Sequence, residues 1–223
     1  MKVFVFGASG RMGQELKKII DSNSKYQWVG GYGQESHGFE LSEKPDVVID
    51  FSLPEALPQL ISLVESQACA LVSGTTGWDE PQRKSFESLK KQHPIFWSAN
   101  MSVGIHLMAQ LVKTLARFGD RYSFQIEETH HIHKKDKPSG TAILLEKAAQ
   151  QSTDQLKPTL SIREGEVFGI HKFIAQSPNE ALEIKHEAFG RSLFAQGALD
   201  VAEWLITQKP GLYTMENFTS GQI

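Results

Sequence analysis

The sequence contains very little cysteine: Cys69 is the only one among 223 residues. A single thiol cannot close an internal disulfide, which excludes the disulfide-stapled domains typical of small secreted proteins. Cys69 also lies in the apolar approach to a predicted strand, with no catalytic motif around it, which argues against a cysteine-dependent aldehyde dehydrogenase. Long apolar runs are missing as well, since none approaches the ~20 residues that a membrane span needs.

Positive charge is not in excess, because 23 Lys and Arg residues face 26 Asp and Glu residues, a formal net charge of -3. This balance argues against general binding to nucleic acid. The N-terminal "MKVFVFGASG" lacks the long apolar core and the cleavage site of a signal peptide. We therefore expect a cytoplasmic protein, with a length that suits one large domain or two small ones.

The first half of the chain predicts a nucleotide-binding fold. Residues 2–6 are β-branched and aromatic, as in a buried strand, and the loop "GASGRMG" then leads into a segment with helical apolar spacing. Further strands are predicted at 26–33, 46–52, 70–77 and 94–102, with a helix at 54–67. Strands that alternate with helices predict a doubly wound parallel sheet.

Three glycines in the first loop have the spacing of a dinucleotide-binding motif. We expect Gly7 to permit the tight turn, Gly10 to let backbone N–H groups approach a pyrophosphate, and Gly13 to let the helix pack closely. The alternative is a glycine-rich turn without a ligand. An acid after the second strand would normally hold the adenine-side ribose. Gly33 and Gln34 stand there instead, so NAD and NADP are barely distinguished.

Two later loops, "SGTTG" (73–77) and "SANMS" (98–102), each follow a predicted strand. Ligands in open α/β sheets bind beyond the carboxyl ends of the strands. The residues expected to face the cofactor are Gly74, Thr75, Thr76, Ala99 and Asn100. Helix capping and turn formation are the alternative roles for this set.

From Ser102 onward the pattern changes to that of an α+β domain. Helices are predicted at 103–119, 140–152 and 192–208, and a strand at 122–131. Residues 159–189 indicate several antiparallel strands, with turns at 164–165, 168–169 and 177–179. Because these strands have no helices between them, they predict a separate mixed sheet whose alternating face could serve as an oligomer interface.

The segment "HHIHKKDKPSGT" (130–141) concentrates positive charge in this acidic chain. Ser139 is well placed to cap the following helix, whose free N–H groups and positive dipole end would attract an anion. With the neighbouring His and Lys side chains, this helix end predicts a site for a small carboxylate or phosphate, and a planar dicarboxylate fits well.

Other interpretations of this segment are a solvated charged loop, a zinc site and a nucleic-acid contact. Zinc is disfavoured because adjacent His residues on a strand point to opposite faces, no further ligand has a matching spacing, and the lysines would repel a cation. We expect no metal. Nucleic acid would require a broader basic surface with aromatic residues. A nicotinamide domain followed by an anion pocket with His and Lys proton donors predicts hydride transfer to a small anionic substrate.

A series of motifs along nearly the whole chain resembles the dihydrodipicolinate reductase (4-hydroxy-tetrahydrodipicolinate reductase) family of bacterial lysine and diaminopimelate synthesis. The motifs are "GASGRMG", "DFS", "SGTTG", "SANMSVGIHLM", "ETHHIHKKDKPSGTA", "HEAFGRSLFAQGAL" and "PGLYTMENF". The resemblance implies a Rossmann domain of residues 1–102 completed by 199–223, a substrate and oligomerisation domain of residues 103–198, and a homotetramer.

The resemblance also implies residue roles. His130 matches the catalytic acid/base and Lys134 the proton donor, while His131, Gly140 and Thr141 match substrate-binding positions. Ser139, from the reasoning above, joins them in the carboxylate site. The matches to cofactor contacts are Gly7, Ala8, Ser9, Gly10, Arg11, Met12, Gly74, Thr75, Thr76, Ser98, Ala99, Asn100 and Met101.

Departures from the family pattern concern the cofactor. Members often carry an acid, sometimes followed by Arg, where this chain has Gly33 and Gln34, and Leu53 stands where some have a basic residue. These differences favour NADH, or use of both NADH and NADPH, over a preference for NADPH. Two other functions stay open: a Rossmann dehydrogenase of another small dicarboxylate, and a non-catalytic NAD(P) sensor, which would not need the proton donors.

Overall fold

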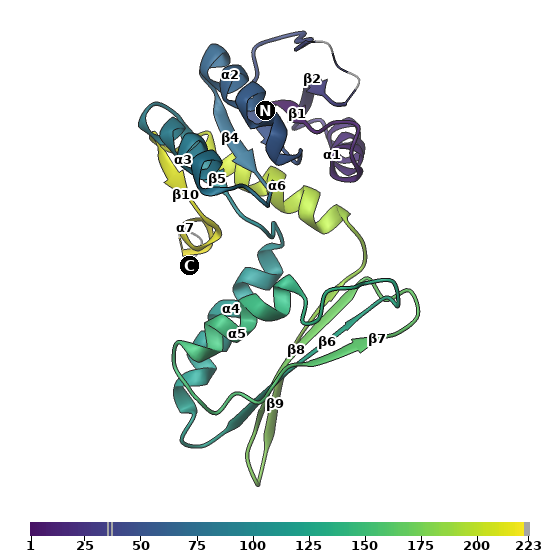
Figure 1. The fold of residues 1–223 in the computed structure, drawn as a ribbon, viewed down its shortest axis with the longest axis vertical. Helices are drawn as coiled ribbons and strands as arrows, with labels where there is room; N and C mark the ends of the chain where they lie inside the picture. The colour runs from purple at the N-terminus through teal and green to yellow at the C-terminus, as the bar shows by residue number, and fades with distance from the viewer. Residues whose placement is uncertain (35, 37, 221–223) are drawn as a thin grey trace. The chain divides into compact units, whose positions relative to one another are not determined.

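The computed structural model describes residues 1–34, 36 and 38–220. The chain forms two compact units, here called the first and the second unit. The first unit combines residues 1–101 with the chain from residue 191 onward, and the second unit comprises residues 102–190 (Figure 1). None of the described helices is long and apolar enough to cross a membrane.

The first unit is built on a parallel sheet of six strands in the order β10-β5-β4-β3-β1-β2. The strands are β1 (Lys2–Phe6), β2 (Gln27–Tyr32), β3 (Val47–Asp50), β4 (Ala70–Ser73), β5 (Pro94–Trp97) and β10 (Gly211–Tyr213). All residues of β3 and β4 are buried, as expected for central strands covered on both faces. The chain order reverses at β1, so the loops after β1 and β3 meet at a topological switch point, where such sheets bind ligands.

Helices cover both faces of this sheet, which confirms the predicted doubly wound fold. They are α1 (Arg11–Ser22), α2 (Leu57–Gln67), α3 (Glu80–Ser88), α6 (Ser192–Leu205) and α7 (Met215–Ser220), with the short 3-10 helices η1 (Pro54–Ala56) and η2 (Leu89–Lys91). Leu60 and Leu63 of α2 and Phe86 of α3 pack with Phe4 and Phe6 of β1 in one apolar core. Helices α1 and α6 contact each other, and α6 also contacts β3, β4 and β5.

The C-terminal part of the first unit differs from the sequence-based prediction. Helix α6 begins at Ser192 and lies wholly in the first unit, ahead of the residue 199 expected for the return of the chain. Strand β10 and helix α7 were not predicted at all. Strand β10 has only three residues, and it exists because Gly211–Tyr213 pair with Pro94–Phe96 of β5, a long-range contact that local sequence does not reveal.

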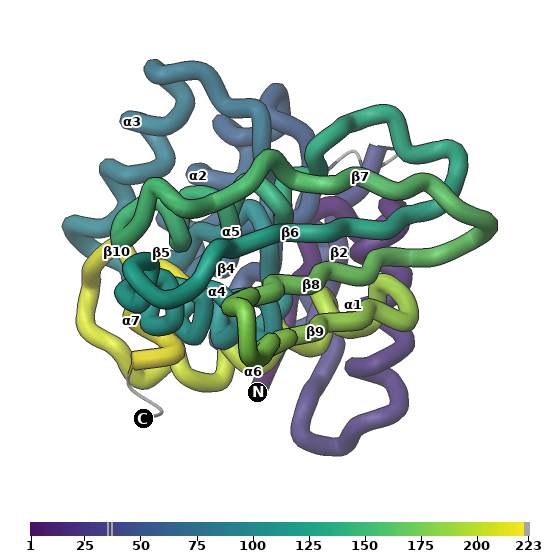
Figure 2. The backbone as a smooth tube through the Cα atoms, turned by 90° about the horizontal axis from the view of Figure 1, so that it is seen from below, coloured from purple at the N-terminus to yellow at the C-terminus, as the bar shows by residue number. Residues whose placement is uncertain are grey.

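The second unit has a sheet of four strands in the order β7-β6-β8-β9, as the tube in Figure 2 shows. The strands are β6 (Ser123–His130), β7 (Leu160–Arg163), β8 (Gly169–Gln176) and β9 (Ala181–Ala188). Helices α4 (Val103–Leu115), followed by η3 (Ala116–Phe118), and α5 (Gly140–Gln150) lie side by side on one face of it (Figure 1). Phe124 and Phe173 stack with ring centroids 5.3 Å apart in the core beneath these helices.

Strand β7 corrects one prediction for this unit. Residues 159–189 were expected to form antiparallel strands only, but β7 pairs with β6 in the parallel direction. Helix α5 separates β6 from β7 in the chain, so the chain can return to the start of β6 and run beside it again. The pairs β6–β8 and β8–β9 are antiparallel, so the sheet is mixed, as predicted.

Candidate active site

The glycine loop of the first unit turns sharply after β1. Gly7 has a φ of +93°, and a Cβ there would lie 2.5 Å from the carbonyl oxygen of Phe51. A Cβ at Gly13 would lie 2.4 Å from the carbonyl oxygen of Gly7, so only glycine lets α1 approach the loop this closely. Both glycines therefore have the conformational roles that their spacing predicted.

The N-terminus of α1 is open toward an adjacent cavity. Among the described side chains none caps this helix at Gly10, and its first turn contains no acid. The cavity has a volume of about 370 Å³. It is lined by Phe6, Gly7, Ser9, Gly10, Tyr32, Gly33, Gln34, Phe51, Ser52, Leu53 and Ala56. Helix N–H groups without a side-chain cap, beside a cavity of this size, fit the pyrophosphate and adenosine of a dinucleotide.

Of the residues predicted in this loop, Gly7, Ser9 and Gly10 line the cavity, whereas Ala8, Arg11 and Met12 do not. At the ribose end, the cavity wall after β2 carries no charge from its lining residues. A Cβ at Gly33 would lie only 2.6 Å from Oγ of Ser9, so a larger residue at this position would require the Ser9 side chain to move. Glu35, the first acid after the strand, lies outside the described residues.

A buried carboxylate organises the loops after β3 and β4. Oδ2 of Asp50 accepts a hydrogen bond of 2.6 Å from the Ser73 hydroxyl, and Oδ1 accepts one of 2.9 Å from the Ser52 amide. Burial raises the pKa of Asp50, against the hydrogen bonds from the serines and from Thr75, which lower it. The predicted contact residues of this region therefore rest on an acid that the sequence analysis did not single out.

The predicted cofactor residues of these loops have different surroundings. Gly74 packs against the Phe51 ring, where a Cβ would lie 2.2 Å from Cε1. The Thr75 hydroxyl accepts from the Ser52 amide at 3.0 Å, and its carbonyl accepts from the Trp97 indole at 2.8 Å. Thr76, by contrast, is exposed.

In the loop after β5, a turn joins two of the predicted residues. The Ser98 hydroxyl donates to the carbonyl of Asn100 at 2.7 Å, and Ala99 between them is exposed. Met101 is buried. The amide of Ser98 donates to the carbonyl of Ser73 at 3.2 Å, which joins this loop to the end of β4.

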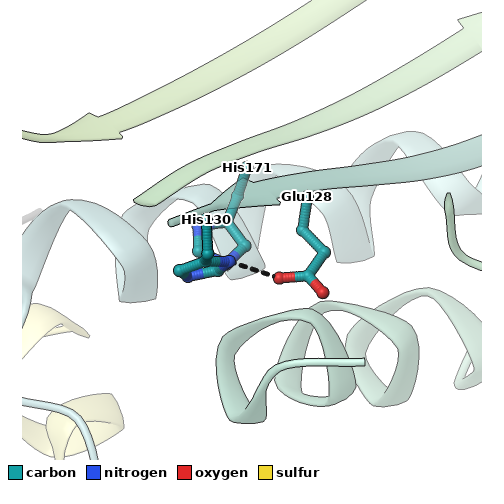
Figure 3. Close-up of side chains that lie close together, drawn as sticks. All are labelled: Glu128, His130 and His171. Carbon is teal, nitrogen blue, oxygen red and sulfur yellow. Dashed lines mark ion pairs between the residues drawn. The ribbon is translucent and has the colours of Figure 1, made fainter. Parts of the chain in front are cut away.

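The second candidate centre lies at the end of β6, where the alternation of the strand directs titratable side chains toward the core. Phe124, Ile126, Glu128 and His130 are all buried on the face that packs toward the helices. Figure 3 shows the Glu128 carboxylate pointing at the ring of His130. Nδ1 of His130 lies 2.6 Å from Oε2 of Glu128, an ion-pair distance, although the ring N–H is not aligned for a regular hydrogen bond.

The other carboxylate oxygen of Glu128 contacts two further elements. Oε1 lies 3.0 Å from Nη2 of Arg163, on β7, and accepts from the backbone amide of Ser139 at 3.3 Å. Both Glu128 and Arg163 have little solvent exposure, at 0% and 8% of their side chains. A buried carboxylate with these donors is stabilised in its charged form.

Ser139 caps α5, as predicted. Its hydroxyl accepts from the amide of Ala142 at 3.2 Å, and the same hydroxyl lies 3.1 Å from Nε2 of His171, on β8. Burial lowers the pKa of His171 to about 3, with a smaller lowering by the nearby His130, so this ring is neutral at physiological pH. Gly140 is exposed and Thr141 is half-buried, so the first turn of α5 can receive a ligand.

The basic loop between β6 and α5 surrounds this helix end. Lys134 forms an ion pair of 2.9 Å with Asp136, and its carbonyl accepts from Nε of Arg163 at 3.2 Å. His131, predicted to bind substrate, is half-buried, and its ring centroid lies 6.2 Å from that of the exposed His133. The structure therefore gathers the predicted His130, Lys134, Ser139, Gly140 and Thr141 around one helix N-terminus.

Glu128, Arg163 and His171 belong to this centre but were missed in the sequence. Glu128 could have been found, because it stands two residues before His130 on a predicted strand and therefore on the same face. Arg163 and His171 come from strands that only the sheet order brings beside β6. Glu128, His130 and His171 also carry donor atoms within 4.8 Å of one another, a spacing that could suit a metal ion. Because the Arg163 guanidinium already neutralises Glu128, we assign no metal here.

A Rossmann-type sheet with an open phosphate loop, joined to a unit with proton-carrying side chains at a basic helix end, defines a nicotinamide-dependent oxidoreductase of a small anionic substrate. Comparison with known proteins identifies the family. Residues 1–101 match the family model "Dihydrodipicolinate reductase, N-terminus", and residues 104–219 match "Dihydrodipicolinate reductase, C-terminus". The chain belongs to the dihydrodipicolinate reductase family.

Curated relatives match over nearly their full lengths. The 4-hydroxy-tetrahydrodipicolinate reductase of Bdellovibrio bacteriovorus is 38% identical over 100% of this chain and 97% of the relative. The enzyme of the same name from Caldanaerobacter subterraneus subsp. tengcongensis is 36% identical over 97% of each. The fold resembles dipicolinate-bound dihydrodipicolinate reductase from Paenisporosarcina sp. TG-14, with a TM-score of 0.82, 19% identity, and 97% and 98% of the two chains covered.

Proposed function

We propose that this chain reduces 4-hydroxy-tetrahydrodipicolinate to tetrahydrodipicolinate with NADH or NADPH, in lysine and diaminopimelate biosynthesis. The observation that carries the proposal is that Glu128 contacts both His130 and the backbone amide of Ser139, the cap of α5, and so pairs His130 with this helix N-terminus, in a chain matched by both family models. This pairing supplies a proton-carrying side chain beside a carboxylate-binding helix end. The relatives carry the name of this reductase, and a structural relative holds dipicolinate, a planar dicarboxylate.

The substrate is held through its carboxylates. One carboxylate binds at the start of α5, beside Gly140 and Thr141, where the helix dipole favours negative charge. His131 and the lysines of the loop provide further positive charge for the second carboxylate. Asp136 is the only acid in this stretch and is paired with Lys134, so the loop keeps a net positive charge.

Net reduction replaces the 4-hydroxyl group with hydrogen, so one hydride and one proton enter and one water leaves. A nicotinamide cofactor bound at the glycine loop supplies the hydride. His130 and Lys134 hold and transfer the proton at the substrate. Burial lowers the pKa of His130, and the charge of the neighbouring Glu128 carboxylate opposes this lowering.

The cofactor end of the site supports NADH, or dual use of NADH and NADPH. Gly33, Gln34 and Ser9 present neither the acid that selects the ribose diol nor an Arg or Lys for a 2'-phosphate. Because the described residues that line this cavity include no charged selector, we expect discrimination to depend on neutral hydrogen bonds and the two cofactors to differ by less than ~10-fold in kcat/KM.

We further propose that the chain assembles into a homotetramer in the cytoplasm. One face of the second unit's sheet is not covered by any described helix of that unit. The apolar residues on this face are Leu160 and Ile162 of β7, which are exposed, and Ile170 and Ile174 of β8, which are half-buried. Apolar residues on an uncovered sheet face favour self-association. Native mass spectrometry over a range of protein concentrations tests this, and a monomer throughout would contradict it.

A direct assay tests the proposed activity. The purified protein is mixed with freshly generated 4-hydroxy-tetrahydrodipicolinate and either NADH or NADPH, and the absorbance of the reduced nicotinamide is followed. We expect consumption with at least one cofactor. Consumption with neither would sink the proposal, and turnover only with a different dicarboxylate would replace the substrate while keeping the reaction class.

A further inference from the structure

The two oxygens of the Glu128 carboxylate contact two different parts of the site, the ring of His130 and the cap of α5. Oε2 faces Nδ1 of His130 at 2.6 Å, whereas Oε1 faces the backbone amide of Ser139 at 3.3 Å. We propose that Glu128 is a positioning residue, which holds His130 with Nδ1 toward the protein and Nε2 toward substrate and ties this ring to the cap of α5. This inference rests on the proposed function, in which His130 handles the proton.

The charged state of Glu128 makes this role physically reasonable. Burial alone would raise its pKa, but hydrogen bonds from Ser161, Arg163 and Ser139 and the charge of His130 outweigh burial, and the pKa is lowered. A carboxylate is therefore present at neutral pH. A neutral imidazole places its single N–H on the nitrogen nearest to an anion, which leaves the other nitrogen as a base.

The opposite edge of the His130 ring has room because of a glycine. Gly169, the first residue of β8, is buried, and a Cβ there would lie 3.1 Å from Nε2 of His130 and 3.4 Å from Cδ2. A side chain at this position would press on the nitrogen that the proposal assigns to substrate. The ring is thus held by an acid on its Nδ1 side, and the glycine at position 169 places no side chain against its Nε2 side.

A buried acid beside the site would repel an anionic substrate, and the positive charge of Arg163 offsets this repulsion. Its guanidinium lies 3.0 Å from Oε1 of Glu128 and also donates to the carbonyls of Lys134 and Asp136. One cation therefore cancels the charge of Glu128 and fixes the loop that carries the second proton donor. When His130 gains a proton, the carboxylate stabilises the resulting imidazolium, as the acid of a catalytic triad does.

The charged and titratable groups around His130 come from three elements and one loop. Glu128 stands on its own strand and raises its pKa, whereas Arg163 on β7 and Lys134 in the loop lower it. His171 on β8 has its ring centroid 5.1 Å from that of His130 and is neutral, since its pKa is about 3. Removing the charge of Glu128 alone should therefore lower the pKa of His130.

Two isolated changes at Glu128 separate charge from position, and a neighbour provides the control. Glu128→Gln keeps the shape but removes the charge. Glu128→Asp keeps the charge but withdraws it from Nδ1 and from the Ser139 amide. Glu127→Gln is the same chemical change one residue earlier, on the other face of β6. Each variant is measured by pH-dependent kinetics and by ¹⁵N NMR of histidine-labelled, cofactor-free protein, which reports the tautomer and pKa of His130.

We expect Glu128→Gln to lower kcat by ~100-fold or more and the KM for NADH by less than about threefold, because only ring placement and charge change. The pKa of His130 falls, because the Glu128 charge that raises it is gone, and the Nδ1–H tautomer loses its predominance. Glu128→Asp should have a kcat between those of the wild type and Glu128→Gln, and its pKa for His130 should stay closer to the wild-type value. Glu127→Gln matches the wild type in all of these.

The inference is overturned if Glu128→Gln keeps both normal kcat and the wild-type tautomer and pKa of His130. It is also overturned if Glu127→Gln produces the same changes as Glu128→Gln, since a general disturbance of the sheet would then explain them. The NMR titration needs no substrate. If the wild type reduces no 4-hydroxy-tetrahydrodipicolinate, the proposed function fails, while the link between Glu128 and His130 is still decided by the spectra.

Discussion

The two units each contain a helix N-terminus with the properties of an anion site, but the two helix ends are built in opposite ways. In the first unit, the N-cap of α1 is Gly10, which provides no side-chain cap, and the adjacent cavity is lined by uncharged residues that include Gly7 and Gly10. In the second unit, Ser139 caps α5, and this serine contacts His171 and donates its amide to the buried Glu128. A cofactor phosphate only has to be held, so space and N–H groups suffice. A substrate that takes up a proton needs titratable side chains in fixed positions.

The largest expected effect is a loss of kcat on replacing either proton-carrying residue of the second unit. We expect His130→Gln and Lys134→Ala each to lower kcat by ~100-fold or more, as for loss of a positioned proton donor. NADH binding, followed by nicotinamide fluorescence, should stay unchanged, because neither residue belongs to the first unit. Near-normal turnover in both variants would remove these residues from the mechanism and would break the contrast between the units.

A second change tests whether the loop before α1 in the first unit requires glycine at position 13. In Gly13→Ala, the new Cβ would meet the Gly7 carbonyl at 2.4 Å and the Ala8 backbone at 2.6 Å. Alanine favours the helix by about 0.5–1 kcal/mol, but overpacking costs about 1–3 kcal/mol. We expect net destabilisation in urea unfolding and weaker NADH binding. Gly38→Ala is the control, because nothing lies within 4 Å of a Cβ there.

A third prediction concerns pH and the buried histidine of the second unit. Burial holds the pKa of His171 near 3, below its value of about 6.5 in the unfolded chain. The unfolded state therefore binds a proton first, so this contribution to stability is complete above pH 6.5 and is lost as pH falls toward 3. The free energy of unfolding should decrease by about 1.4 kcal/mol per pH unit from this one group.

Urea unfolding between pH 7 and pH 4.5 measures this slope. His171→Gln is the matched variant, because its amide can reach the position of Nε2 beside Ser139 but does not titrate. The slope should be smaller in this variant. Equal slopes in the two proteins would show that His171 does not carry the pH dependence.

The smallest expected effect comes from comparing two helix caps, Ser102, which we expect to affect stability only, and Ser139, which we expect to affect substrate binding as well. Ser139 caps α5 and Ser102 caps α4, and each hydroxyl lies near a histidine, at 3.1 Å from His171 and 3.3 Å from His186. Replacement of either serine by alanine should cost about 1 kcal/mol of stability. Only Ser139→Ala should also raise the substrate KM, by roughly fivefold. Equal substrate KM values for the two variants would contradict the assignment of α5 as the carboxylate site.

Much of the fold could be predicted because its signals are local. The apolar strand at 2–6, the glycine loop and the helical spacing after it correspond to β1 and α1. The cap at Ser139 was also predictable, because capping depends on a few consecutive residues. Strand β10 and the parallel pairing of β7 could not be read in this way, since both depend on partners far along the chain.

The same distinction applies to the site. The residue types at 130–141 already indicated proton donors and an anion-binding helix end, because His, Lys and a helix cap have these properties wherever they occur. Only the tertiary structure decided which groups from outside its own strand surround His130. Glu128 faces it from the same strand, and the sheet order adds Arg163 from β7 and His171 from β8. Chemical capacity belongs to individual residues, whereas pKa and orientation depend on burial and on neighbours that folding brings within a few ångströms.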